Sequence, residues 1–243
     1  LIAGCGTGQH AISTASRFSN SRVSAVDLSL SSLGYAARKT RELGLSNIDY
    51  GQGDILELAS MKRQFDIIES AGVLHHLQEP LAGWRVLVDM LHPDGLMMIG
   101  LYSETARRSI VQARALIAVK GYSSSPEGIR ECRQDIIEMS KGVDNEISKI
   151  PTYTDFYSLS DCRDLIFHIQ EHRFTLPQIE DALQDFGLEF LGFEIHDQAV
   201  LRAFREANPR QDALGSLSAW HEFELANADT FVGMYQFWCR KKA

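Results

Sequence analysis

Three glycines at alternate positions near the start of the chain constrain its fold more than any other feature. They stand in the run Leu1-Ile-Ala-Gly4-Cys-Gly6-Thr-Gly8-Gln-His10, after apolar residues that can finish a strand and before a helical pattern. Glycine is needed where the backbone takes a positive φ, or where a Cβ would collide with a ligand. A strand, a glycine turn and a helix also present free N–H groups at the helix start. The alternative interpretation is a plain tight turn.

Two acidic residues favour a bound nucleoside over a plain turn. Asp27 follows the next apolar run, where a carboxylate can accept both hydroxyls of a ribose. The spacing Gly-x-Gly-x-Gly differs from the Gly-x-Gly-x-x-Gly of dinucleotide sites, which favours a cofactor without a pyrophosphate. Gly53-Asp54 follows the third expected strand, where the carboxylate can accept a hydrogen bond from an adenine amino group. The alternative for Asp54 is a capping residue before a short helix.

Composition excludes several classes of partner. The net charge of −8 argues against nucleic acid or an anionic membrane as the main partner. The four cysteines lie far apart and form no Cys-x-x-Cys pair, so neither a zinc site nor a disulfide framework is indicated. The chain has no apolar run of about 18 residues and no signal peptide, so we expect a soluble, cytoplasmic protein.

Strands and helices alternate along the first hundred residues, which predicts a parallel sheet covered on both faces. The rhythm breaks between residues 102 and 174, where only helical stretches occur, and then resumes. A length of 243 residues fits one α/β domain with an insertion. We expect strands at 1–3, 22–26, 48–52, 65–70, 96–101, 188–195 and 230–240, with a turn at 93–95. We expect helices from the glycines to 18, from Ser29 or Ser31 to 43, and at 81–91, 105–119, 126–141, 160–171 and 175–186.

Five segments together resemble the successive motifs of class I S-adenosylmethionine (SAM)-dependent methyltransferases, in family order and at family spacing over residues 1–101. The resemblance implies a Rossmann-like seven-stranded, mostly parallel sheet with helices on both faces and an inserted helical cap. It divides the chain into a cofactor-binding half (1–102), a helical substrate cap (103–173) and a C-terminal part of the methyltransferase domain (174–243). The segments are Leu1–Gly8, Ala25–Ser29, Gly53–Ile55, Phe65–Leu77 and Leu91–Gly100.

The resemblance also implies a role for each matching residue. The glycines would let the backbone approach the methionine end and the ribose of SAM. Asp27 would hold the ribose, Leu28 and Ile55 would contact the adenine, and Asp54 would meet its amino group. One position departs from the family pattern, because Ile2 stands where members often carry an acid, so Gln9, His10 or an upstream segment could serve the amino-acid end instead. The implied cofactor residues are Gly4, Cys5, Gly6, Gly8, Asp27, Leu28, Gly53, Asp54, Ile55, Ser70, Ala71 and Gly72.

Part of the later sequence is similar to bacterial methyltransferase modules fused behind tetratricopeptide repeats. The runs Ile99–Arg107, Cys162–Leu165 and His168–Pro177 carry this likeness. The chain begins inside its first expected strand, so we expect an upstream segment, and the resemblance makes it such a repeat domain. The implied methyl acceptor is a small molecule, or a protein or peptide.

Candidate acid–base residues follow the ends of two expected strands. His75 comes after the fourth strand, and Tyr102 and Glu104 come after the fifth, at the edge where open α/β sheets bind ligands. Methyl transfer needs a base only when the acceptor loses a proton. Further candidates are His76, which reads equally as a capping residue, and His168, Glu171, His172 and Arg173. His168 and His172 have the spacing of two metal ligands on one helix face, but a third ligand is missing and a solvated face is the alternative. Arg107 and Arg108 could grip an acidic substrate or face solvent at a helix start. Tyr153, Phe156 and Tyr157 could roof the pocket or pack the insertion.

We therefore expect a methyltransferase that moves a methyl group from SAM to an acceptor. The alternative is a SAM-binding sensor or interaction module without turnover, which the isoleucine at position 2 and the lack of an obvious strong base keep open. A nicotinamide-dependent oxidoreductase is a third candidate, disfavoured by the glycine spacing.

Overall fold

A single sheet organises the computed structural model, which describes residues 1–142, 144–168 and 170–242. Its strands lie in the order β3-β2-β1-β4-β5-β7-β6. The first five run parallel, and β7 is antiparallel to both of its neighbours. This confirms the predicted seven-stranded, mostly parallel sheet. The strands are β1 (Ile2–Ala3), β2 (Val23–Asp27), β3 (Ile48–Gln52), β4 (Phe65–Ala71), β5 (Leu91–Leu101), β6 (Leu188–Phe193) and β7 (Tyr235–Lys241).

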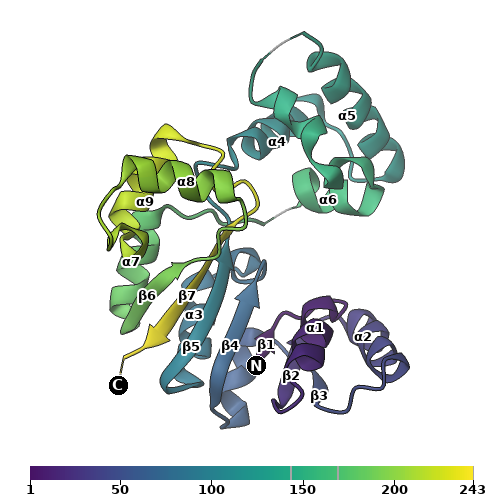
Figure 1. Ribbon diagram of the computed structural model, residues 1–243. Helices are drawn as coiled ribbons and strands as arrows, with labels where there is room; N and C mark the ends of the chain where they lie inside the picture. The colour runs from purple at the N-terminus through teal and green to yellow at the C-terminus, as the bar shows by residue number, and fades with distance from the viewer. Residues whose placement is uncertain (143, 169, 243) are drawn as a thin grey trace.

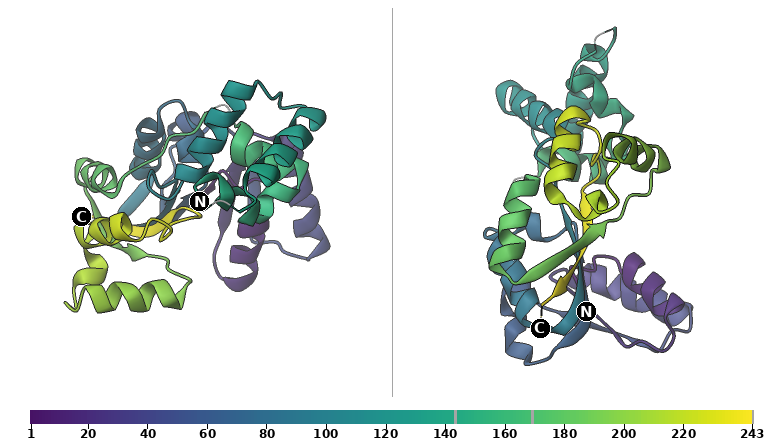
Figure 2. Two further views of the ribbon diagram at one scale, coloured as in Figure 1. Left: turned by 90° about the horizontal axis from the view of Figure 1, so that it is seen from above. Right: turned by 60° about the vertical axis from the view of Figure 1, so that its left-hand side comes forward.

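Helices cover both faces of the sheet, as Figures 1 and 2 show. On one face α1 and α2 pack against β1–β3 through a small apolar cluster. On the other, α3, α7 and α9 bury the main core, in which Trp84 and Trp220 are almost fully enclosed. The helices are α1 (Gln9–Arg17), α2 (Leu30–Glu42), α3 (Pro80–Asp89), α4 (Arg108–Lys120), α5 (Pro126–Met139), α6 (Leu159–Phe167), α7 (Leu176–Asp185), α8 (Gln198–Ala207) and α9 (Leu217–Ala226). Short 3₁₀ turns are η1 (Ile55–Met61), η2 (Leu74–His76), η3 (Ile147–Thr152), η4 (Thr154–Tyr157) and η5 (Ala213–Gly215).

Local signals set the helix starts that the sequence predicts. Ser29 caps α2, where its hydroxyl accepts a hydrogen bond from the N–H of Ser32 at 3.2 Å. Thr175 and Gln178 form a reciprocal capping box at the start of α7. Both helices therefore begin where a short polar side chain satisfies backbone donors that the first turn leaves free.

Three expected boundaries differ from the structure by four or five residues, and other ends differ by up to three, such as α4, which begins at Arg108 rather than residue 105. Strand β5 begins at Leu91 rather than residue 96, because the pairing jumps from Phe65–Leu91 to Ile67–Leu96 and the predicted turn becomes an irregularity within the strand. Asp94 adopts a left-handed conformation there, with φ of 59°. Strand β7 begins at Tyr235 rather than residue 230, and α6 ends at Phe167 rather than residue 171.

The inserted segment folds as a helical lobe beside the sheet, and Figure 1 shows α4, α5 and α6 standing apart from α1 and α2. The lobe has its own apolar core, separate from that of the sheet, in which Ile129, Cys132 and Phe156 are fully buried. None of the helices in the described part of the chain combines the length and apolarity that crossing a bilayer requires.

Candidate functional site

The glycine turn joins β1 to α1, and all three of its glycines have positive φ: 81° at Gly4, 52° at Gly6 and 82° at Gly8. A Cβ on Gly4 would lie 2.2 Å from a methyl group of Val73, and one on Gly8 would lie 2.5 Å from Ala36. These two glycines permit close packing against other elements. At Gly6 a Cβ would meet nothing within 4 Å, so this part of the turn faces open space.

Asp27, the last residue of β2, holds this turn in place. Its Oδ2 accepts a hydrogen bond from the Gly6 N–H at 2.7 Å, and its Oδ1 accepts one from the Ser29 N–H at 2.9 Å. A carboxylate offers about four acceptor sites, so Asp27 retains capacity for a ligand's hydroxyls. The neighbouring Leu28 exposes 62% of its surface, so its side chain is open to a ligand.

The next strand end carries the second acidic residue. Gly53 donates its N–H to the Asp27 carbonyl at 3.1 Å, which ties the end of β3 to that of β2. Asp54 caps η1 through Oδ1, which accepts from the Leu56 N–H at 2.9 Å. The capping alternative therefore describes one of its two oxygens. Ile55 is buried beneath the turn.

At the end of β4 the polar side chain of Ser70 is buried and fixes the strand, and it does not face a ligand site. The hydroxyl of Ser70 is buried and donates to the Ala3 carbonyl at 3.1 Å, so it joins β4 to β1. Ala71 is exposed, and Gly72 has a φ of 75°. Cys5, within the glycine turn, is a buried free thiol whose pKa is raised to about 11, chiefly by burial, so it stays protonated and is a poor nucleophile.

His75, Tyr102 and Arg107 form a three-layer stack beyond the ends of β4 and β5. The rings of His75 and Tyr102 are stacked, with their centres 3.7 Å apart. The guanidinium of Arg107 also contacts the Tyr102 ring and lies 3.6 Å from its centre. His75 is fully buried, and within the described residues neither ring nitrogen has a hydrogen-bond partner. Burial, with smaller contributions from His76, Arg107 and His168, lowers the pKa of His75 to about 2. The imidazole is therefore neutral and a weak base.

An ion-pair network fixes Arg107. Its Nε and Nη2 donate to the two carboxylate oxygens of Glu171 at 3.0 and 2.7 Å, and Arg114 donates to the same carboxylate at 2.8 Å. The Glu171 side chain is only 1% exposed and that of Arg107 only 5%. The two arginines belong to the start and middle of α4, so Arg107 does not face solvent, in contrast to one interpretation of the sequence.

Glu171 lies on an extended segment, residues 170–174, which we call the strap. The His172 N–H donates to the His75 carbonyl at 2.8 Å, and the Phe174 N–H donates to the Tyr102 carbonyl at 2.9 Å. Glu104, half-exposed, pairs with Arg173 of the strap at 2.9 Å. The strap thus bridges the ends of β4 and β5, beside the predicted residues His75, Tyr102 and Glu104.

The strap overturns the helix-face interpretation of His168 and His172. Because α6 ends at Phe167, these residues do not share a helix face. The ring of His168 instead lies 4.2 Å from that of His76, centre to centre. No group of three or more potential ligands that could hold a metal occurs in the described parts of the chain. Of the three lobe aromatics, Phe156 is fully buried in the lobe core, whereas Tyr157 is 57% exposed.

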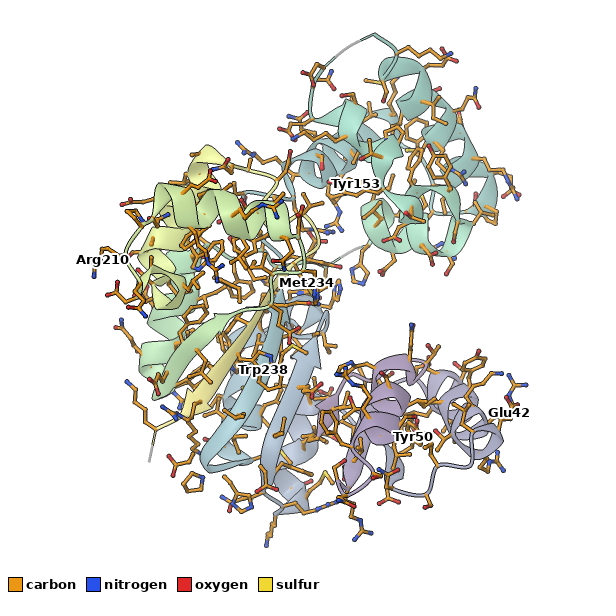
Figure 3. The ribbon with its side chains drawn as sticks, viewed as in Figure 1. Glu42, Tyr50, Tyr153, Arg210, Met234 and Trp238 are labelled. Carbon is orange, nitrogen blue, oxygen red and sulfur yellow. The ribbon has the colours of Figure 1, made fainter. Side chains whose placement is uncertain are left out.

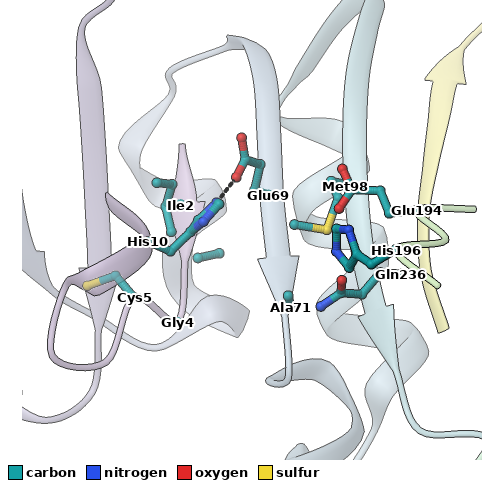
Figure 4. A pocket seen from close by; sticks show the side chains of 11 residues that line it. Ile2, Gly4, Cys5, His10, Glu69, Ala71, Met98, Glu194, His196 and Gln236 are labelled. Atoms are coloured by element: carbon teal, nitrogen blue, oxygen red, sulfur yellow. Dashed lines mark hydrogen bonds and ion pairs between the residues drawn. The ribbon is translucent and has the colours of Figure 1, made fainter. Parts of the chain in front are cut away.

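Sequence reasoning missed a carboxylate beside the glycine turn. A cavity of about 360 Å³ lies between the turn and β4, β5 and β7, and Figure 4 shows the side chains that line it. Glu69 of β4 projects into it and contacts His10 of α1. A glutamate between the buried residues Ile68 and Ser70 of this strand was the available signal. A second missed carboxyl, Glu224, is fully buried and accepts hydrogen bonds from Ser103 and Tyr235; burial raises its pKa. Figure 3 shows Met234 just before the start of β7, near the carboxyl end of β5.

The sequence of the chain is similar to those of known proteins. Residues 1–95 match the sequence family described as methyltransferase domain. An uncharacterized protein of Synechococcus sp. is 28% identical over 235 residues, which cover 93% of this chain and 55% of that protein. The chain therefore spans about half the length of this curated relative.

Solved structures agree on the fold. PKMT2 from Rickettsia typhi, solved in complex with AdoHcy, superposes with a TM-score of 0.77 at 15% identity, over 99% of this chain and 48% of PKMT2. Magnesium protoporphyrin IX methyltransferase from Synechocystis, solved with bound SAH, gives a TM-score of 0.54 at 13% identity, over 99% of this chain and 73% of the enzyme. The chain thus has the Rossmann-like methyltransferase fold, and its first 95 residues match the methyltransferase domain.

Proposed function

We propose that the chain binds SAM and transfers its methyl group to an acceptor. The observation that carries this proposal is the Asp27 carboxylate, which holds the open Gly6 turn at 2.7 Å and keeps acceptor capacity at the carboxyl end of β2. The match of residues 1–95 to the methyltransferase domain supports it, as do the AdoHcy and SAH bound by the structural relatives.

The residues at the strand ends fit such a ligand. Asp27 would accept the ribose hydroxyls, and the exposed Leu28 with the turn at Ile55 would flank the adenine. Asp54 would use its second oxygen for the adenine amino group, while Ser70 acts indirectly by fixing β4 against β1. The proposed cofactor residues remain Gly4, Cys5, Gly6, Gly8, Asp27, Leu28, Gly53, Asp54, Ile55, Ser70, Ala71 and Gly72.

The bound cofactor supplies an electrophilic methyl group on a sulfonium, and the chain's task is to orient the acceptor for in-line displacement and to exclude water. Tyr102 has its ring fixed by His75 and Arg107, so its phenol is held in one orientation. Burial raises the pKa of Tyr102, which keeps the phenol protonated and able to donate a hydrogen bond to the acceptor. His75 is too weak a base to accept a proton at neutral pH, so its part is to orient Tyr102. Residues 103–173 would form the substrate cap.

Replacing Asp27 by alanine tests the cofactor site. We expect S-adenosylhomocysteine to bind at least about tenfold more weakly, because hydrogen bonds to a charged acceptor contribute roughly 1.5–3 kcal/mol. Isothermal titration calorimetry measures the affinity, and Asp49→Ala, which removes an exposed carboxylate of β3, is the matched control. Unchanged affinity in Asp27→Ala, or no binding to the unaltered chain, would refute the proposal.

A SAM-binding module without turnover is the second candidate. It is favoured by the state of the predicted acid–base residues, since His75 is neutral and Glu104 is paired with Arg173. Incubation with SAM carrying a labelled methyl group and a panel of small-molecule and peptide acceptors separates the two candidates. Label in any acceptor excludes the binding module, whereas tight SAM binding with no transfer across the panel favours it. A cytoplasmic location and an upstream tetratricopeptide repeat domain remain predictions.

A further inference from the structure

Glu69 lies beside Ile2 in the sheet, and Ile2 is the position at which the resembled family often carries an acid. Strands β1 and β4 are neighbours, and Ile2 pairs in register with Glu69. Side chains of paired residues in neighbouring strands project from the same face of a sheet. Both residues accordingly line the same cavity, next to Gly4 and Cys5 of the glycine turn.

The Glu69 carboxylate lies in a partly enclosed and electronegative setting. Its side chain is 13% exposed, and its ion-pair partner among the described residues is the Nε2 of His10, whose own side chain is 55% exposed. The bond to Glu69 raises the pKa of His10. Glu194 adds a second carboxylate to the cavity wall, but its Oε1 already accepts from the Trp238 indole at 2.7 Å. Glu69 thus pairs with an exposed imidazole, whose place a ligand's ammonium group can take.

Sheet order aligns this carboxylate with the proposed cofactor residues. The order β3-β2-β1-β4 places four groups on or just after successive strands, which lie about 4.8 Å apart: Asp54 after β3, Asp27 at the end of β2, the glycine turn after β1, and Glu69 within β4. A ligand with its adenine at β3 and its ribose at β2 would cross the turn and present its remaining end to β4. In SAM and its demethylated product that end is an amino acid with an ammonium group.

We propose that Glu69 binds the ammonium group at the amino-acid end of SAM and S-adenosylhomocysteine, in place of the acid missing at Ile2. The inference rests on the proposed function and assigns a cofactor contact on a strand residue outside the glycine turn. The ammonium competes with His10 for the carboxylate, because both are hydrogen-bond donors that bind a carboxylate most strongly when charged.

Two ligands that differ at the amino-acid end provide the test. S-Adenosylhomocysteine contains this end, whereas 5′-methylthioadenosine keeps the adenosine and the sulfur atom and lacks it. Both are titrated by calorimetry into the full chain and into Glu69→Gln, which removes the charge and keeps the side-chain shape. Glu194→Gln is the matched control, because it removes an equal charge from the wall of the same cavity.

We expect Glu69→Gln to weaken S-adenosylhomocysteine binding about tenfold or more and to change 5′-methylthioadenosine binding less than about twofold. Glu194→Gln should change both less than about threefold. The inference is overturned if Glu69→Gln leaves S-adenosylhomocysteine binding unchanged, weakens both ligands equally, or has no larger effect than Glu194→Gln. Glu69→Asp keeps the charge, so its affinity for S-adenosylhomocysteine should fall between those of the unaltered chain and Glu69→Gln. This variant guards against a loss of folding in the glutamine variant. If the unaltered chain binds neither ligand, the proposed function itself fails.

Discussion

Breaking the ion pair between Glu171 and Arg107 should strongly destabilise the packing of the helical lobe on the sheet. Replacing Glu171 by glutamine removes the charge but nearly preserves the shape. Arg107 then keeps a guanidinium in a site where 5% of its side chain is exposed, with no carboxylate at 2.7 Å. Arg114 loses the partner at 2.8 Å. Breaking a buried pair in this way costs about 3–5 kcal/mol, because the remaining charge is uncompensated.

A matched surface change sets the scale of this effect. Glu104→Gln breaks the ion pair between Glu104, whose side chain is 50% exposed, and Arg173. We expect a loss below about 1 kcal/mol, because solvent screens exposed pairs. Urea denaturation followed by circular dichroism gives both values, provided the slope of the free energy with urea is unchanged. A loss in Glu171→Gln that is no larger than that in Glu104→Gln would show that the network is dispensable.

A double replacement separates the two charges. Changing Glu171 and Arg107 together to methionine removes the carboxylate and the more deeply buried of the two guanidinium groups that donate to it, and such apolar substitutions often recover stability lost in the single variant. We expect the double variant to be more stable than Glu171→Gln. Equal or lower stability would mean that packing around the side chains, rather than an uncompensated charge, explains the loss.

Two further predictions concern His75 and the glycine turn. His75 has a pKa of about 2 in the folded chain against an ordinary value of 6.5, so between these values the unfolded chain binds more protons and the free energy of unfolding rises with pH. The unaltered chain should therefore lose about 1 kcal/mol more than His75→Phe when the pH falls from 6 to 5, measured by urea denaturation at each pH; equal losses would contradict the burial of a neutral imidazole. Gly6→Ala should lower stability by only about 1–2 kcal/mol, from its positive φ alone, yet abolish S-adenosylhomocysteine binding. Gly4→Ala should unfold more readily because its Cβ would lie 2.2 Å from Val73, and equal thermal stability of the two variants would argue against this packing.

Patterns that depend on neighbours in sequence predicted much of the fold. Strand β3 has the predicted bounds, and the cap at Ser29 is one of the two proposed. The meeting of the glycine turn and Asp27 also followed from sequence, because parallel strands end at the same edge of the sheet. The structure adds the hydrogen bond that joins them.

Features set by contacts between distant segments escaped prediction. The run from His168 to Glu171 has helical spacing, but the strap places its backbone donors on the carbonyls of His75 and Tyr102, and these bonds override local propensity. The pKa of His75 depends on its burial beneath Tyr102 and the strap. The pairing of Ile2 with Glu69 needs the register of two strands whose paired residues are 67 positions apart in the chain, which no local pattern encodes.

The two ends of the helical lobe meet at one point of the sheet edge. Ser103, where the chain leaves the sheet, forms an isolated bridge with Phe174, where it returns, and Glu104 and Phe174 are joined by a backbone hydrogen bond of 2.9 Å. Because both ends of the lobe meet at this joint, the internal length of the lobe does not set the spacing between β5 and α7. Lobes of other sizes could be grafted at this joint without moving the strand ends at Asp27 and Glu69. Evolution could thus vary what faces the sheet while leaving those strand ends untouched.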